Sequence, residues 1–276
     1  PLVCEYRRRR CSLRVDDKIL TAWNALMISA LCRLYQDSGE RVYLEAAQKA
    51  DRFISEKLCA DDILHVSFRA GKRGVGGFLD DYAAYLFAQL ALYGATLKRT
   101  YLERAERLCR EALSRFVDRE NGGFYLYGEG NEKLILRPKE TWDGALPSGN
   151  SLMGWNLVRL SRLTGKEVYA REAQRQLAFL TAHASQAPTG YAMALLSLLE
   201  SREPSVQVTV APAIGEDLGK LALILPPEGV VLVVDPSDTY PLKNGKTTFY
   251  VCRGNTCLPP VNDPTEYDRL FHCLSE

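Results

Sequence analysis

Apolar and polar positions follow a helical period in three long segments of the chain, and these segments align with one another without gaps. Each segment has an apolar helix rich in Leu and Ala, a short connector, and a second helix with Arg, Glu and Gln on one face. The aligned segments begin at Trp23, Asp81 and Gly149, so that Tyr43, Tyr101 and Tyr169 coincide. We therefore predict three repeated helical hairpins.

The first helix of each hairpin is apolar nearly all round, whereas the second has a single apolar stripe. This difference predicts an inner row of helices buried on several sides and an outer row that faces water. Residues 189–201 add a seventh helix. Buried inner helices favour a curled α/α toroid over an open solenoid. Since a ring of six hairpins needs about five more helices, we expect the chain to be a piece of a longer protein.

Gly-rich segments lie between the hairpins at residues 63–78 and 122–137, and both alternate apolar and polar residues around Gly. This pattern predicts short β-hairpins. Both segments follow an outer helix and precede an inner one. The antiparallel packing of the helices therefore places them at the same rim.

After Pro204 the chain changes to β-branched runs bounded by Pro, Gly and Asn, with one helical pattern at residues 214–224. The predicted fold is mainly α. It consists of a partial (α/α)6 toroid of about seven helices over residues 1–204, with short rim β-hairpins. Residues 205–276 form a small C-terminal α/β region.

Composition narrows the range of partners. Thirty-five Lys and Arg against 34 Asp and Glu leave a net charge of +1, so no general field favours nucleic acid or an anionic membrane. The run Arg7–Arg10 is a local exception that we interpret as a solvated segment. No apolar run approaches the roughly 18 residues of a membrane span. The eight Cys lie mostly at apolar helical positions, which favours a reducing, cytoplasmic location.

Four motifs together resemble a known family. They are DDKILTAWNALMISAL at 16–31, GGFLDDYAAYL at 76–86, WDGALPSGNSLMGWNLVRLSRLTG at 142–165 and FYVCRGNTCLPP at 249–260. They are similar, in this order, to the C-terminal part of a family named after a spermatogenesis-associated protein. The resemblance implies an (α/α)6 barrel like that of N-acylglucosamine 2-epimerases and six-hairpin glycosidases. It also implies an N-terminal thioredoxin-like domain as a partner, which this sequence does not include.

Acidic residues gather where the inner helices are expected to start. Inner helices of a toroid run in one direction, so three acidic loops converge on one rim. Paired carboxylates can act as acid and base on a sugar, and aromatic rings can cover its apolar face. The candidate catalytic residues are Asp80, Asp81, Glu140 and Asp143.

Further residues on or near this rim are candidates for substrate binding. They are Asp17, Lys18, Trp23, Asn24, His65, Phe78, Tyr82, Trp142, Ser148 and Asn150. Structural roles compete with this interpretation. Asp17 and Ser148 are suited to cap helices, Trp23 to pack in the core, and Asn150 to tie a loop to a helix.

Histidine limits the analogy with the epimerases, which use His in the barrel as acid and base. This chain has only His65, His183 and His272, and none lies in a motif that carries a catalytic role over. An epimerase mechanism would therefore need Lys18 or a carboxylate as the base, or a His supplied by hairpins upstream.

Cys252 and Cys257 flank the tetrapeptide RGNT, so a short hairpin would bring the two thiols together. Three interpretations remain open: free structural thiols, a reversible disulfide, and a metal site. Zinc would need more ligands than this pair offers. We expect no metal and no cofactor.

Two functions follow from these patterns. The first is a carbohydrate-active or carbohydrate-binding toroid with an acidic, aromatic-lined mouth. The second is a non-catalytic helical scaffold, or a redox partner of the thioredoxin-like domain, in which Cys252 and Cys257 exchange electrons. An incomplete ring also predicts an apolar open edge near residues 1–30 or along the seventh helix.

Overall fold

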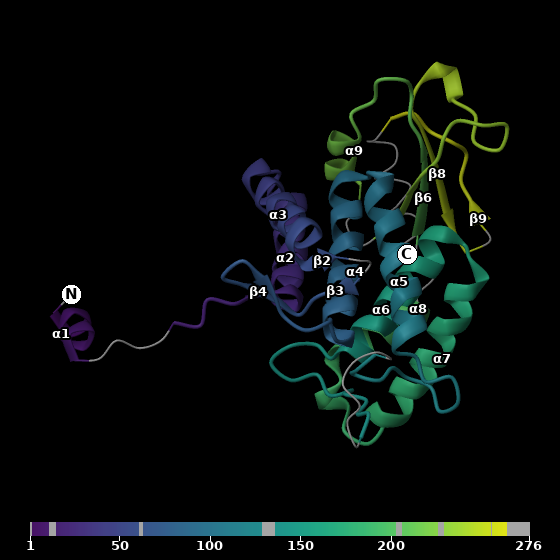
Figure 1. The fold of residues 1–276 in the computed structure, drawn as a ribbon. Helices are drawn as coiled ribbons and strands as arrows, with labels where there is room; N and C mark the ends of the chain where they lie inside the picture. The colour runs from purple at the N-terminus through teal and green to yellow at the C-terminus, as the bar shows by residue number, and fades with distance from the viewer. Residues whose placement is uncertain are drawn as a thin grey trace.

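The structure is a computed structural model. It describes residues 2–10, 15–60, 63–128, 136–202, 206–225, 229–254 and 256–263. Helical hairpins dominate it (Figure 1). The inner helices are α2 (Thr21–Ser38), α4 (Leu79–Thr96), α6 (Gly149–Thr164) and α8 (Ala192–Arg202). The outer helices are α3 (Arg41–Phe53), α5 (Arg99–Arg115) and α7 (Glu167–Ala184).

The inner helices pack side by side in the order α2, α4, α6, α8, and each outer helix covers the inner helix that precedes it. This is an arc of an α/α toroid, as the repeat pattern predicts. Helices α4 and α6 lie in the middle of the arc and are buried on most sides. The main core, which includes Ile28, Leu86 and Leu157, fills the space between the two rows.

The two ends of the arc expose apolar side chains. Trp23 is 62% exposed on α2, and Leu199 is 58% exposed on α8. Among the described inner helices, α2 packs against α4 on one side, and Trp23 is exposed on its surface, so the expectation that Trp23 packs in the core is wrong. The predicted apolar open edge is present on both end helices.

Short strands lie just before α2 and between α3 and α4. Strands β1 (Ile19–Leu20), β4 (Ser67–Arg69) and β5 (Lys72–Arg73) form one antiparallel sheet, and β2 (Cys59–Ala60) pairs with β3 (Ile63–Leu64). A π-helical turn, η1 (Ile54–Leu58), joins α3 to β2, and helix α1 (Leu2–Arg10) stands apart from the arc (Figure 1).

The hairpin predicted within residues 63–78 is the β4–β5 pair, which turns at Ala70 and Gly71 with φ of 48° and 78°. The one predicted within 122–137 lies partly outside the described residues. Its described part has a single bridge between Val117 and Phe124.

The C-terminal region is a four-stranded sheet in the order β7-β6-β8-β9. Its strands are β6 (Val206–Ala211), β7 (Val230–Val233), β8 (Thr248–Arg253) and β9 (Thr256–Cys257). Helix α9 (Leu218–Ile224) crosses between the parallel strands β6 and β7, and the 3-10 turn η3 (Lys243–Gly245) precedes β8. The sheet and α9 enclose a second, smaller core.

This sheet docks on the C-terminal ends of the inner helices, away from the helix starts (Figure 1). Near the end of α4, the Tyr93 hydroxyl donates to the Val231 carbonyl at 3.1 Å and accepts from the Val233 N–H at 3.3 Å. Leu97 ends α4 in the left-handed conformation with φ of 54°. Its side chain is buried in the small core, and that burial offsets a conformation costing about 1–2 kcal/mol in non-glycine residues.

Candidate functional site

The inner helices start at one rim, and the carboxylate of Asp81 joins two of them. Its Oδ2 accepts a 3.0 Å hydrogen bond from the backbone N–H of Phe78, the residue before α4. Its Oδ1 accepts one of 3.2 Å from the N–H of Ala22 in the first turn of α2. Burial raises the pKa of Asp81 to about 7. Asp81 therefore serves two helix N-termini at once.

Asp80, its neighbour, reaches the other way along the arc. Its Oδ1 accepts a 2.9 Å hydrogen bond from the N–H of Gly149, the first residue of α6. Burial raises the pKa of Asp80, and the charge of Glu140 raises it further. Within the described part of the chain, Oδ2 of Asp80 has no hydrogen-bond partner. This carboxylate is thus positioned by one oxygen and open at the other.

Asp143 joins α6 to α8. Its Oδ1 accepts from the Ser148 N–H at 2.9 Å, and its Oδ2 accepts from the Met193 N–H at 2.8 Å and the Ala194 N–H at 3.3 Å. Its own N–H donates at 2.8 Å to the carbonyl of Gly190, which ends the 3-10 turn η2 (Pro188–Gly190). Both oxygens of Asp143 are therefore used to hold helix starts.

Together, Asp81, Asp80 and Asp143 link the starts of α2, α4, α6 and α8 in succession. Free backbone N–H groups and the positive end of the helix dipole make each start a natural place for a carboxylate. The structure thus places Asp80, Asp81 and Asp143, from two of the three acidic loops, at the starts of the inner helices. It also uses these carboxylates as caps more fully than the sequence indicated.

Ser148 is the N-cap of α6, in agreement with the capping interpretation. Its Oγ accepts from the Ser151 N–H at 3.1 Å, and it also lies 3.2 Å from the Thr141 carbonyl, to which it donates. Asp17, by contrast, caps no helix. Helix α2 starts four residues later, and Asp17 pairs with Arg69 of β4 on an exposed surface.

Asn150 lies fully buried one residue into α6 and ties the preceding loop to the helix. Its Oδ1 accepts from the Phe124 N–H at 2.8 Å and from the Gln176 side chain at 3.1 Å. Its Nδ2 donates to the carbonyls of Phe124 at 3.0 Å and Glu140 at 2.8 Å. These bonds occupy the whole amide, and they account for Asn150 without a ligand.

The contacts of Tyr82 also indicate a structural role. The side chain is 1% exposed, packs against Phe116 with ring centroids 5.3 Å apart, and accepts a 3.1 Å hydrogen bond from the Leu64 N–H. It anchors the β2–β3 pair to α4.

The side chains of Glu140 and Trp142 differ from the other rim residues, because neither forms a hydrogen bond with a backbone group of the described residues. Glu140 is exposed, and its carboxylate has no hydrogen bond or ion pair within the described part of the chain. Trp142 is 58% exposed, and its ring lies edge-on to Tyr191 at 5.7 Å. A Cβ on Gly190 would come within 2.4 Å of that ring, so Gly190 makes room for it. Glu140, Trp142 and the open oxygen of Asp80 remain available to a ligand.

Other predicted residues lie beside the first hairpin. Lys18 forms a 3.0 Å ion pair with Asp16 on the surface. The Asn24 amide donates to the Leu20 carbonyl at 2.7 Å. His65 Nδ1 lies 2.9 Å from the Gly74 carbonyl within the small sheet. Each of these side chains thus has a local partner in its own segment.

Phe78 packs edge-on against Tyr127 at 5.1 Å, just before α4. Trp23 points outward from α2 and contributes to the open edge rather than to the group formed by Asp80, Glu140 and Trp142. His183 lies near the end of α7, with Nδ1 2.9 Å from the Phe179 carbonyl. His272 lies outside the described residues.

Sequence reasoning missed a second carboxylate-centred cluster, at Asp118 in the loop after α5. Its pKa is lowered by the ion pair with Lys139 at 2.6 Å and by hydrogen bonds from the Asn121 N–H and the Tyr125 hydroxyl. The Lys139 ammonium also donates to the Gly122 carbonyl at 2.6 Å. This cluster stiffens the loop that carries Glu140.

A buried polar network between the helices was also missed. Asp51 of α3 accepts hydrogen bonds from the Tyr85 hydroxyl at 2.8 Å, from the Gln89 amide at 2.6 Å and from Arg104 at 3.2 Å. An acid on the apolar face of an outer helix and a Gln within an inner helix were the signals available in the sequence.

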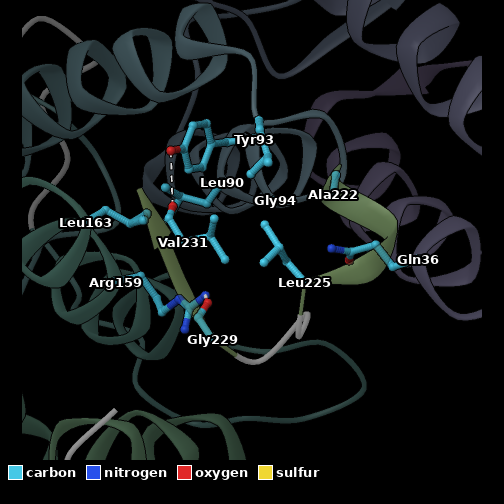
Figure 2. A pocket seen from close by; sticks show the side chains of 11 residues that line it. Gln36, Leu90, Tyr93, Gly94, Arg159, Leu163, Ala222, Leu225, Gly229 and Val231 are labelled. Atoms are coloured by element: carbon cyan, nitrogen blue, oxygen red, sulfur yellow. Dashed lines mark hydrogen bonds between the residues drawn. The ribbon is translucent and has the colours of Figure 1, made fainter. Parts of the chain in front are cut away.

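Two pockets lie away from the rim. One, of about 410 Å³, lies between η1, β2, α4 and α5, with Cys59, Tyr85, Arg104 and Arg107 among its lining residues. A smaller one, of about 40 Å³, lies where the C-terminal region meets α4 and α6 (Figure 2). Figure 2 shows Arg159, Leu225 and Val231 around it. Neither pocket is lined by Asp80, Glu140 or Trp142.

Cys252 and Cys257 form a disulfide across the β8–β9 hairpin, with Cα atoms 4.1 Å apart. Of the alternatives left open by the sequence, the bonded pair is the one observed. Within the described residues, no group of three or more His, Cys, Asp or Glu side chains could hold a metal ion. Every helix in the described part of the chain is also too short or too polar to span a membrane.

Known proteins resemble this chain in both sequence and fold. No model of a protein family matches it. Spermatogenesis-associated protein 20 of Homo sapiens is 26% identical over 297 residues, which cover 96% of this chain and 37% of that protein. The chain thus spans less than two fifths of the length of this relative.

Solved structures share the arrangement of helices. A GH76 alpha-mannanase of Bacteroides thetaiotaomicron matches 68% of this chain and 53% of its own, with a TM-score of 0.55 and 17% identity. Cellobiose 2-epimerase of Spirochaeta thermophila matches 61% of this chain and 44% of its own, with a TM-score of 0.51 and 17% identity. The chain is therefore similar over nearly its whole length to one part of spermatogenesis-associated protein 20, and it shares the α/α toroid fold of the mannanase and the epimerase.

Proposed function

We propose that the rim at the starts of the inner helices binds a carbohydrate, with Asp80 and Glu140 as its acid–base pair and Trp142 as its stacking surface. The observation that carries this proposal is the hydrogen bonding of the two carboxylate oxygens of Asp80. One oxygen is fixed by the Gly149 N–H, and the other has no partner among the described residues. Burial raises the pKa of Asp80 and so favours its protonated form, which is the form that donates a proton.

Glu140 supplies the second carboxylate. Its charge acts on Asp80, yet it is exposed and has no ion-pair partner in the described part of the chain. One carboxylate, Asp80, is half-buried, and the other, Glu140, is exposed to water. Such unlike surroundings allow one carboxylate to act as the acid and the other as the base or nucleophile. Asp81 and Asp143, whose oxygens cap helices, then hold the rim in shape and take no part in proton transfer.

Trp142 adds the apolar contact that sugar rings need. Its ring is held by Tyr191 on one side, and more than half of its surface is open to solvent. Stacking of a sugar face on such a ring, beside carboxylates that accept bonds from hydroxyl groups, is a general mode of carbohydrate binding. The mannanase and the epimerase with which this chain shares its fold act on sugars by their names, which supports the same ligand class here.

Titration calorimetry with mannobiose, cellobiose and N-acetylglucosamine tests the proposal. The wild-type chain is compared with Trp142→Ala, Glu140→Gln and Asp80→Asn. We expect at least one sugar to bind, and binding to weaken about 10-fold or more in Trp142→Ala, since stacking contributes on the order of 1–2 kcal/mol. Asp80→Asn should retain binding but lose any turnover of that sugar, measured by product analysis.

Asp37→Asn is the matched control, because Asp37 lies near the far end of α2 in an exposed pair with Arg33. It should bind sugar like the wild type. If no sugar binds, or if all variants bind equally, the rim is not a carbohydrate site.

A scaffold function is the second candidate. The observation that favours it is the use of both oxygens of Asp81 and of Asp143 as caps, which leaves fewer catalytic groups than the sequence indicated. Under this alternative the wild-type chain binds none of the three sugars. The Trp142→Ala and Asp80→Asn variants then differ from it in stability alone.

A further inference from the structure

The β8–β9 hairpin holds Cys252 and Cys257 in register. The two residues are direct partners in the antiparallel pair, next to the Arg253–Thr256 pair that closes the turn. On the other side of the pair, the Leu258 N–H donates to the Val251 carbonyl at 2.9 Å. Backbone pairing therefore keeps the two sulfurs opposite each other whether or not they are bonded.

The disulfide is accessible from solvent. Strand β9 is the edge strand of the sheet, Cys257 is exposed, and Cys252 is half-buried. Two free cysteines differ from this pair: Cys32 and Cys109 are buried within helices, and burial raises the pKa of each thiol to about 12. The bonded pair is thus placed for attack by an incoming thiolate, whereas the buried thiols are not.

The fold of the sheet does not depend on this bond. The small core formed by Val206, Val208, Phe249 and Val251 lies in the sheet interior, and β8 pairs with β6 over six residues. A cross-link between residues five positions apart closes a short loop, which constrains the unfolded chain far less than a long one. Opening the bond should therefore leave the sheet folded.

We propose that Cys252 and Cys257 form a thiol–disulfide exchange site that accepts electrons from a dithiol reductant. A thiolate of the reductant attacks the exposed Sγ of Cys257, the Cys252–Cys257 bond breaks, and Cys252 leaves as a thiolate that takes up a proton. The second thiol of the reductant then attacks the mixed disulfide and releases Cys257. The reductant loses two electrons and becomes a disulfide, and the two cysteines become thiols.

Trapping of the mixed disulfide tests the proposal. The oxidised chain is incubated with a Cys-X-X-Cys reductase whose second Cys is replaced by Ser, which stops the reaction after the first attack. We expect a one-to-one covalent adduct, mapped by peptide mass spectrometry to Cys257. Cys257→Ser and Cys252→Ser should each abolish it, because neither variant has the bond to attack. Cys4→Ser, which removes an exposed free thiol, should leave the yield unchanged.

A second measurement separates an exchange site from a structural cross-link. Near-ultraviolet circular dichroism and thermal unfolding are recorded before and after treatment with dithiothreitol. We expect the chain to remain folded and the bond to re-form on oxidation. An adduct on another cysteine, no adduct, or unfolding on reduction would each overturn the proposal.

Discussion

Asp80 and Gly149 meet across the boundary between α4 and α6, where the Asp80 Oδ1 accepts a 2.9 Å hydrogen bond from the Gly149 N–H. The approach is so close that a Cβ on Gly149 would lie 2.4 Å from the same oxygen and 2.9 Å from Leu79. Gly149 is thus the residue that lets the starts of two inner helices touch. This contact fixes the position of Asp80, whereas burial and the charge of Glu140 raise its pKa.

Gly149→Ala should destabilise the chain by about 1–3 kcal/mol, because the added methyl group pushes Asp80 and Leu79 away from α6. Urea unfolding measures the loss. Gly94→Ala in α4 is the control, since its Cβ would lie 3.6 Å from the Gln36 side chain of α2, an ordinary van der Waals contact. That variant should keep or gain stability, by up to about 1 kcal/mol. Equal effects at both positions would contradict the close contact.

Stability should fall as pH rises from about 4 to 7, through Asp81. The pKa of this carboxyl is about 7 in the folded chain against an ordinary value of 3.8, so the folded state keeps a proton that the unfolded state releases in this range. Below about pH 4 both states are protonated, and above about pH 7 both are ionised, so the loss levels off there.

Asp81→Asn isolates this effect, because the amide does not titrate. The difference in unfolding free energy between wild type and variant should shift in favour of the variant as pH rises, by roughly 1.4 kcal/mol per unit of pKa shift at most. Urea unfolding at pH 4, 5.5 and 7.5 measures it. If the difference in unfolding free energy between wild type and variant stays constant across this range, burial does not raise the pKa of Asp81.

Asp51→Ala should cost about 2–4 kcal/mol of stability, because it leaves the buried Tyr85 hydroxyl and Gln89 amide without their acceptor. Arg104, whose side chain is 42% exposed, returns to water and adds little. Asp37→Ala is the control, since its exposed pair with Arg33 contributes about 0–1 kcal/mol. Chemical denaturation of the two variants side by side tests the ranking.

Trp23→Gln should change stability by no more than about 0.5 kcal/mol, although tryptophan is usually a core residue, because the ring lies mostly in solvent. Leu199→Gln should behave in the same way at the other end of the arc. Both variants should lower self-association in sedimentation velocity, since they break up exposed apolar edges. Leu157→Ala in the core of α6 should instead cost about 2–5 kcal/mol. A loss of that size in Trp23→Gln would show that the edge is buried.

The sequence by itself determined the helical hairpins and the positions of Asp80, Asp81 and Asp143 near the starts of the inner helices. Helical periodicity and the caps at Ser148, Gly39 and Gly165 act over a few residues, so they can be read locally. The repeat then gives the common direction of the inner helices, and with it the shared rim. The spacing of Cys252 and Cys257 likewise allowed a bond across a short hairpin.

Only the tertiary structure decided which rim residues are left free. Asp81 binds an N–H 59 positions away, and Asp80 one 69 positions away, and no local pattern encodes such pairs. Trp23 lies in an apolar helical segment that is typical of the core, yet its exposure depends on what packs beside α2. The surroundings of Asp80 are therefore a property of helix starts brought together by packing, because desolvation and hydrogen bonding are set by neighbours in space.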